Sequence, residues 1–475
     1  MTKFYLTTTL PYVNAAPHIG FALEIIQADA MARYKKLAGF DVFFNFGTDE
    51  HGKKVYDKAL ESGKDPKKYC DEYAAKFDQL KKALNLSYDN FIRTTDPNHI
   101  QASQEFWRLC KSNGDIYKKN YKSKYCVGCE LEKTDSELVN GRCPLHPNKD
   151  LEIIDEENYF FRFSKYQDKL LQLYRDNPHF VVPAYRLKEI TEFVKNGLQD
   201  FSISRLKSKM PWGIDVPDDP DHVMYVWFDA LINYISALGW PNNIKKFNSW
   251  WPVTQFAGKD NLRQQAAIWQ AMLLSAGLPN SKQIFIHGFI SVNGKKISKS
   301  LGNVIDPYTI VATYGTDALR YYLLREIPAY GDGDFSERRF KELYNSDLAN
   351  SLGNTVSRIA KLAEASGFAF TESAIPKTIY RDAQKDAFED YRFDLVLNNI
   401  WVTDLGTIEK HIDQNSPWLI KDKRTLKEIL QEEINGLRLV AEKLKPFLPQ
   451  TAQKILDQFK GPTIKATAPL FPRLT

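Results

Sequence analysis

Three cysteines and a histidine lie within one short, turn-rich stretch of the sequence. Cys126 and Cys129 form a CxxC pair, and Cys143 and His146 form a CxxH pair after a gap of hairpin size. Three thiolates and one imidazole make a complete tetrahedral ligand set for Zn²⁺ and leave no open position for a substrate. We therefore predict one structural zinc ion, with unmetallated free thiols as the alternative.

A second candidate site is the basic loop at residues 294–303, which reads GKKISKSLGN. Lys296 and Lys299 flank Ser298 in a segment bounded by glycines. Mobile ammonium groups can stabilise the charge that grows on pyrophosphate as it leaves a nucleoside triphosphate. The alternative is a solvated basic loop without a catalytic role.

The third candidate is the loop LPYVNAAPHIG at residues 10–20. It joins an expected strand to a helix that begins near Pro17, and the free N–H groups of such a helix start favour phosphate. His18 would add a hydrogen-bond donor, and Gly20 would let a nucleotide approach the backbone. A surface-capping histidine beside a packing glycine is the alternative.

These three segments need a scaffold, which the hydrophobic periodicity predicts. Residues 4–9 and 41–46 read as strands around an amphipathic helix that ends at Gly39, and the second strand is apolar with little alternation. That pattern is typical of a parallel strand covered on both faces. It returns as strands at 253–257 and 284–287 around another helix. We predict an α/β fold with a doubly wound, Rossmann-like parallel sheet.

Changes in pattern divide the chain into five segments. We expect residues 1–114 and 223–290 to be the two halves of the Rossmann-like catalytic domain, 115–222 an inserted connective domain with the zinc knuckle, 291–343 the region of the basic loop, and 344–475 a bundle of amphipathic helices.

The composition excludes several classes of protein. The 475 residues are 43% hydrophobic and 26% charged, which is ordinary globular usage with room for several domains. A net charge of +5 is too small to indicate nucleic-acid binding by itself. No apolar run reaches membrane-spanning length and no signal segment is seen, so we expect a soluble, cytoplasmic protein without disulfides. Cys70 and Cys110 are expected to be buried apolar side chains.

Together the motifs resemble the methionyl-tRNA synthetases among the class I aminoacyl-tRNA synthetases. PHIGF resembles the HIGH signature and KISKS the KMSKS signature, in the right order. Other similar segments, which span most of the chain, are TTTLPYVNAAPHIG, GTDEHG, YCVGCE, MYVWFDAL, GKD and LANSLGNTVSR. The resemblance implies ATP-dependent activation of L-methionine to methionyl-adenylate with release of pyrophosphate, then transfer to tRNA(Met), including the initiator. It also implies Mg²⁺ with ATP, a stem-contact region at 291–343 and an anticodon-binding bundle at 344–475.

The resemblance also implies roles for single residues. The expected ATP-binding residues are Pro17, His18, Gly20, Asp260, Lys296, Ser298 and Lys299, of which His18, Gly20, Lys296 and Lys299 are the expected catalytic residues. The expected methionine-binding residues are Leu10, Tyr12, Asp49, Trp227, Tyr234 and Gln265, with Asp49 meeting the substrate amino group. Trp418 and Glu409 fall at the anticodon-reading positions. For the pocket aromatics and Trp418 the alternative is structural packing, and His51 fits either a loop cap or a site residue.

Four departures from the family pattern limit what the resemblance implies. Phe21 replaces the second histidine of the HIGH signature, whereas Ile297 is a volume-conserving replacement in the KMSKS signature. Gln265 and Ile268 stand where the family commonly has a histidine and an aromatic, which bears on side-chain selectivity. Glu409 replaces an asparagine, and its carboxylate would repel RNA phosphate.

Two other functions remain as alternatives. A synthetase-like paralogue would pass the activated amino acid to another acceptor, but the zinc module and the helical segment argue against it. A non-catalytic RNA-binding derivative would not need His18, Gly20, Lys296 and Lys299 together. Longer relatives carry a C-terminal dimerising module, so the length leads us to expect a monomer.

Overall fold

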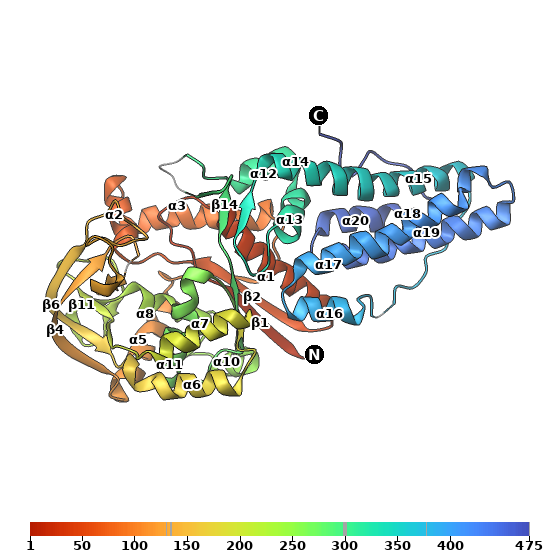
Figure 1. Cartoon of the computed structure of the whole chain (residues 1–475). Coiled ribbons are helices and arrows are strands. Elements are labelled where there is room, and N and C mark those ends of the chain that lie inside the picture. The colour runs from red at the N-terminus through yellow and green to blue at the C-terminus, as the bar shows by residue number, and fades with distance from the viewer. Residues whose placement is uncertain (130, 134, 298–301, 377, 475) are drawn as a thin grey trace.

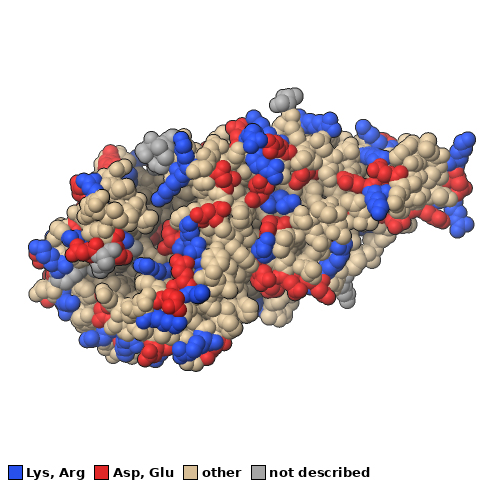
Figure 2. Space-filling model, viewed as in Figure 1, with Lys and Arg blue, Asp and Glu red and all other residues tan. Residues whose placement is uncertain are grey.

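The computed structural model describes residues 1–129, 131–133, 135–297, 302–376 and 378–474 (Figure 1). The molecule is elongated, with a small antiparallel sheet at one end, a helical bundle at the other and a parallel sheet between them. On the face shown in Figure 2, acidic and basic side chains are interspersed and the surface is hollowed in its left half. Among the described residues, no helix combines the length and apolar character needed to cross a membrane.

A parallel sheet of six strands forms the centre of the molecule, in the order β3-β2-β1-β12-β13-β7. Its strands are β1 (Lys3–Thr8), β2 (Asp41–Thr48), β3 (Asn90–Arg93), β7 (Val181–Val182), β12 (Val253–Gly258) and β13 (Gln283–His287). Tyr5 pairs with both Phe43 and Val253, which joins the two predicted halves in one sheet. The predicted α/β class with a parallel sheet is confirmed.

Helices cover both faces of this sheet, and its side chains alternate between two hydrophobic cores. Phe4 and Leu6 belong to one core, whereas Tyr5 belongs to the other. This double burial explains the nearly continuous apolar strands. The surrounding helices are α1 (Ile19–Leu37), α2 (Lys53–Glu61), α3 (Pro66–Asp78), α4 (Leu80–Ala83), α5 (Pro97–Ser112), α6 (Gln167–Asp176), α7 (Ala184–Lys195), α8 (Val226–Ala230), α9 (Asn233–Ser236), α10 (Ile244–Trp250) and α11 (Trp269–Ser275).

The segment predicted as an insert, residues 115–222, builds a sheet of its own. Its four antiparallel strands are β4 (Ile116–Cys126), β5 (Leu131–Lys133), β6 (Glu152–Phe161) and β8 (Phe201–Ser202), and a smaller sheet joins β9 (Ser204–Leu206), β10 (Asp215–Val216) and β11 (Asp219–Met224). The same segment also gives β7 to the central sheet, where Val181 pairs with Ile284. A two-residue strand is too short to carry a periodic signal, which is why the sequence did not predict it.

A third small sheet holds the basic loop beside the end of the central sheet. It contains β14 (Ile290–Val292), β15 (Lys295–Lys296) and β16 (Gly333–Phe335). The helices that follow along the chain are α12 (Pro307–Tyr314), α13 (Thr316–Arg325), α14 (Glu337–Leu343), α15 (Asn354–Ser366), α16 (Asp382–Glu389), α17 (Phe393–Asn399), α18 (Gly406–Asn415), α19 (Lys423–Leu444) and α20 (Pro449–Gln458). The predicted helical character after residue 344 is confirmed, and two π-helical segments, Tyr344–Gly353 and Ile400–Leu405, interrupt it.

Candidate active site

All six residues predicted to bind methionine line one pocket beside the carboxyl end of β2. The pocket is lined by Thr9, Leu10, Tyr12, Asp49, Trp227, Ala230, Leu231, Asn233, Tyr234, Asn261, Gln264 and Gln265. Asp49 directly follows β2, and its peptide pairs with that of Tyr12. Trp227 Nε1 donates a hydrogen bond to the Tyr12 hydroxyl at 2.7 Å, which links the two aromatic walls. The pocket therefore combines apolar and aromatic walls with one carboxylate.

Gln265 and Ile268, the two departures from the family pattern in this region, lie in different surroundings. Gln265 lies in the π-helical segment Gln264–Ile268, and its side-chain oxygen accepts a hydrogen bond from Gln255 at 2.6 Å. Gln255 in turn accepts one from Ser281 at 2.6 Å, so the Gln265 amide is held in place. Ile268 packs against one of the two hydrophobic cores and is not among the described residues that line the pocket.

Three of the seven predicted ATP-binding residues, Pro17, His18 and Gly20, lie at the start of α1. His18 caps the helix, and its Nδ1 accepts a hydrogen bond from the Gly20 N–H at 3.1 Å. A Cβ at position 20 would lie 2.9 Å from His18 Cε1. Glycine at this position therefore leaves room for the His18 ring to approach the Gly20 backbone. Phe21 is half-buried, and its ring lies 4.4 Å from the His18 ring and edge-on to Phe77. Phe21 thus packs beside the capped helix start instead of adding a second polar group.

A buried acid and histidine lie behind this helix start, and the sequence did not predict either of them. Glu24 accepts hydrogen bonds from the backbone and hydroxyl of Thr9, at 2.8 and 2.6 Å, and lies 2.9 Å from His287 Nε2. His287 Nδ1 lies 2.7 Å from the Gly288 carbonyl. Both ring nitrogens lie within hydrogen-bond distance of acceptor oxygens, an arrangement that favours the protonated ring. Burial by itself would lower the pKa of His287. The hydrogen bond and the negative charge of Glu24 outweigh this effect, so the pKa lies above its ordinary value.

The predicted zinc ligands converge at the tip of the antiparallel sheet. Their ligand atoms all lie within 4.8 Å of one another, with Cys129 Sγ 3.5 Å from Cys143 Sγ and 3.3 Å from His146 Nδ1. Ligand atoms about 2.0 to 2.3 Å from a tetrahedral Zn²⁺ are spaced in this way. A Cβ at Gly128 would lie 2.4 Å from His146 Cγ, so glycine makes room for the imidazole. The four residues fit a zinc ion with no open position.

Comparison with known proteins decides the family. Residues 4–151 and 132–360 match the family described as tRNA synthetases class I (M). The methionine–tRNA ligase of Thermotoga maritima is 43% identical over 472 residues, which cover 95% of this chain and 74% of that protein. This chain belongs to the methionyl-tRNA synthetase family. The ligase of Thermosynechococcus vestitus is 42% identical over 99% of this chain and 92% of its own length.

Solved structures of the family agree with the fold. The Mycobacterium tuberculosis methionyl-tRNA synthetase in complex with methionyl-adenylate superposes with a TM-score of 0.92 and is 36% identical, and the match covers all of both chains. A second structure of the same synthetase, in the free state, superposes with a TM-score of 0.83. The whole chain thus has the fold of a methionyl-tRNA synthetase.

The KMSKS-like loop of this family member is described only in part. Lys296 is exposed at the end of β15, and its carbonyl accepts a hydrogen bond from Asn303 at 3.0 Å. Ile297, the replacement in the signature, packs against a hydrophobic core. Ser298 and Lys299 lie outside the described residues. Asp260 lies two residues after Gly258, the last residue of β12. A Cβ at position 258 would lie 2.9 Å from the Asp260 carboxylate.

The two predicted anticodon residues lie in the helical bundle, Glu409 in α18 (Figure 1) and Trp418 in the 3-10 turn Pro417–Leu419 that follows it. The Trp418 side chain is 51% exposed, with the Arg358 guanidinium 4.7 Å from the ring centre. Glu409 accepts hydrogen bonds from Ser351 and Thr355, both at 2.9 Å. An exposed aromatic face is thus present for stacking, whereas the Glu409 carboxylate is engaged within the bundle.

Proposed function

We propose that this chain is a methionine–tRNA ligase. It activates L-methionine with ATP to methionyl-adenylate and pyrophosphate, and then transfers the methionyl group to tRNA(Met), including the initiator. The observation that carries this proposal is the pocket that combines the Asp49 carboxylate with aromatic walls, and the capped start of α1 adds to it. Family membership at 42–43% identity over nearly the whole chain supports it.

The pocket chemistry suits the amino acid. The Asp49 carboxylate would bind the substrate ammonium group, which sets the direction of the amino acid in the pocket. Trp227 and Tyr234 would then face the thioether, and sulfur–aromatic contacts contribute about 0.3 to 1.5 kcal/mol each. Leu10 and Tyr12 complete the walls. Gln265, fixed by Gln255, would present its amide to the bound side chain.

Activation needs charge stabilisation more than a protein nucleophile. A carboxylate oxygen of methionine attacks the α-phosphorus, the bond to the bridging oxygen breaks, and pyrophosphate leaves with the negative charge. His18, Lys296 and Lys299 would donate to the phosphates, and Gly20 lets the nucleotide approach the helix start. Pro17, Asp260 and Ser298 complete the proposed ATP site. Mg²⁺ bound to the phosphates would neutralise part of their charge.

In the second step, the terminal ribose hydroxyl of tRNA attacks the methionyl carbonyl and AMP leaves. The zinc knuckle would organise the inserted segment 115–222 that guides the acceptor end, while 1–114 and 223–290 form the catalytic domain. Residues 291–343 would contact the tRNA stem, and 344–475 would bind the anticodon through Trp418. The five cysteines are free thiols, and a reducing compartment such as the cytoplasm keeps the three sulfur ligands available for zinc.

One pair of assays tests the function. ATP–pyrophosphate exchange is measured with each amino acid in turn, followed by charging of total tRNA. Methionine-dependent exchange together with charging is the expected result. Exchange without charging would instead indicate a paralogue with another acceptor, and the absence of both would indicate a non-catalytic RNA-binding derivative.

A further inference from the structure

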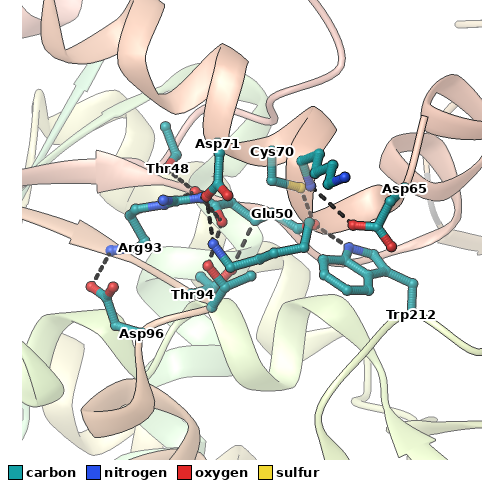
Figure 3. A network of polar contacts seen from close by, with 12 residues as sticks. Thr48, Glu50, Asp65, Cys70, Asp71, Arg93, Thr94, Asp96 and Trp212 are labelled. Atoms are coloured by element: carbon teal, nitrogen blue, oxygen red, sulfur yellow. Dashed lines mark hydrogen bonds and ion pairs between the residues drawn. The ribbon is translucent and has the colours of Figure 1, made fainter. Parts of the chain in front are cut away.

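The residue after Asp49 is a fully buried glutamate with an unusually complete set of partners (Figure 3). Glu50 Oε1 accepts hydrogen bonds from Arg93 Nε at 2.6 Å and from the Thr48 hydroxyl at 2.7 Å. Glu50 Oε2 accepts from Arg93 Nη2 at 2.8 Å and from the Thr95 hydroxyl at 2.5 Å. The Arg93 guanidinium therefore binds the Glu50 carboxylate through two parallel hydrogen bonds, a geometry that fixes the orientation of the carboxylate as well as balancing its charge.

The backbone around Asp49 is held with equal completeness. The Glu50 N–H donates to the Thr94 hydroxyl at 2.9 Å, and the Glu50 carbonyl accepts from Trp212 Nε1 at 2.6 Å. On the other side, the Asp49 N–H donates to the Pro11 carbonyl at 2.9 Å. The Asp49 carbonyl accepts from the Val13 N–H at 3.2 Å. Every peptide group next to Asp49 is thus fixed by a neighbour outside its own strand.

We propose that Glu50, Arg93 and Trp212 are positioning residues that hold Asp49 in place for the amino group of methionine. This inference rests on the proposed function. Asp49 lies just beyond the last residue of β2, where its backbone is held by a single β-bridge to Tyr12 and its position depends on the neighbouring residues. A carboxylate that must meet an ammonium group needs a rigid support, because a misplacement of about 1 Å can cost a factor of about 100 in rate.

Trp212 extends this support to the inserted segment. It lies between β9 and β10, and its ring stands edge-on to His51 with the ring centres 5.6 Å apart. His51 Nδ1 lies 3.0 Å from Asp229 Oδ2, on the same helix as the pocket residue Trp227. These contacts connect the amino-acid pocket to the inserted segment, which also carries the predicted zinc site.

A matched control is available elsewhere in the chain. Asp115 is also fully buried, and its carboxylate accepts hydrogen bonds from Lys165, Tyr166 and Ser275. It does not line the methionine pocket, so Asp115→Asn removes a comparable buried charge without touching Asp49. In Glu50→Gln, Arg93 keeps its second ion pair, with Asp71 at 2.6 Å, which limits the damage to the fold.

The test is ATP–pyrophosphate exchange by the full chain, with methionine and ATP varied separately. We expect Glu50→Gln to raise the KM for methionine roughly 10- to 100-fold and the KM for ATP less than about threefold. Trp212→Phe removes the indole N–H donor and leaves a smaller aromatic ring, so it should raise the KM for methionine about 2- to 10-fold. Asp115→Asn should lower the thermal midpoint and leave both KM values unchanged.

Three outcomes would overturn the inference. One is a methionine KM within about twofold of the wild type in both Glu50→Gln and Trp212→Phe. Another is an equal rise in the KM for methionine and the KM for ATP, which would indicate that the whole active site is disturbed and not Asp49 in particular. If Glu50→Gln does not fold, an unchanged methionine KM in Trp212→Phe decides against the role. A wild-type chain without methionine-dependent exchange would refute the proposed function itself, whereas an active wild type with unaffected variants refutes only the positioning role.

Discussion

Nε2 of His287 lies 2.9 Å from a carboxylate oxygen of Glu24, and both side chains are buried behind the start of α1. The pair joins the last residue of β13 to the helix that carries His18 and Gly20. When His287 is protonated, it forms an ion pair with the Glu24 carboxylate next to the proposed nucleotide site. Its protonation state is therefore relevant to both stability and ATP binding.

We predict that His287 titrates above the ordinary histidine pKa of about 6.5. Glu24 raises the pKa, so the stabilisation from this pair is complete below the pKa of the unfolded chain and is lost as the pH rises through the folded-state pKa. Glu24→Gln should lower the pKa of His287. NMR titration of ring-labelled histidine checks this, with His287→Asn assigning the signal. A His287 pKa at or below 6.5 in the wild type would contradict the prediction.

Lys296→Ala should slow adenylate formation by roughly 100- to 1,000-fold, since one well-placed donor to a developing charge contributes about 3 to 4 kcal/mol. Lys295→Ala is the control, because Lys295 is the adjacent exposed lysine of the same short strand. The same loss is expected for Lys299→Ala. Pre-steady-state adenylate formation is the measurement, with circular dichroism to show an intact fold. Near-normal rates in both Lys296→Ala and Lys299→Ala would refute the role of this loop.

Tyr12→Phe should weaken methionine binding without affecting ATP. The substitution removes the hydroxyl that accepts the 2.7 Å hydrogen bond from Trp227 and keeps the ring. A typical net hydrogen bond contributes about 0.5 to 1.5 kcal/mol, so the Kd for methionine should rise roughly 2- to 12-fold. Calorimetric titration with methionine measures it. An unchanged Kd would show that this contact does not shape the pocket.

Much of the fold was predictable because it rests on local periodicity. The strands around α1 and the apolar run of β2 are short-range patterns, and the structure places them within a residue or two of the prediction. β7 was missed because two residues carry no period. The π-helical segment Gln264–Ile268 was missed because its register depends on packing, and π-bulges of this kind often occur at functional sites.

The site was predictable where sequence motifs mark it, and otherwise was not. The six pocket residues and the four predicted metal ligands come from recognisable segments, and the structure brings each set together. Glu24 and Glu50 were missed because their partners, His287 and Arg93, lie far away in sequence. One available signal was an acidic residue within a largely apolar stretch of helix, as at Glu24 between Leu23 and Ile25. Such a charge must find a buried partner, but the sequence does not say which.

Asp29→Asn should destabilise the chain strongly. Asp29 and Arg320 are both fully buried and lie 2.8 Å apart, and Arg320 also donates to the carbonyls of Pro446 and Phe447, before α20. Removing one partner of a buried pair typically costs about 3 to 5 kcal/mol. Thermal denaturation should show a clear fall in midpoint, whereas Asp382→Asn, which breaks an exposed pair with Lys385, should leave it unchanged.

The same pair predicts how stability depends on pH. Burial alone would raise the pKa of Asp29, but the Arg320 and Arg33 guanidiniums lower it below its usual value. The stabilisation is therefore present above the unfolded pKa of about 3.9 and is lost as the pH falls through the folded-state pKa. Asp29→Asn should accordingly flatten the acid limb of the denaturation profile. An acid limb as steep as that of the wild type would contradict this.

Gly128→Ala should release zinc while leaving all four ligands in place. The added Cβ would lie 2.4 Å from His146 Cγ, a contact that the backbone or the imidazole must relieve by moving. Because a closed tetrahedral site depends on all four ligands, a displaced imidazole should lower affinity strongly. Gly406→Ala is the control, since its Cβ meets only an ordinary contact at 3.6 Å. Elemental analysis after dialysis against a chelator should give about one zinc per chain for the wild type and for Gly406→Ala, and much less for Gly128→Ala. Full retention of zinc in Gly128→Ala would contradict this prediction, because it would mean that the backbone relieves the contact while the imidazole keeps its place.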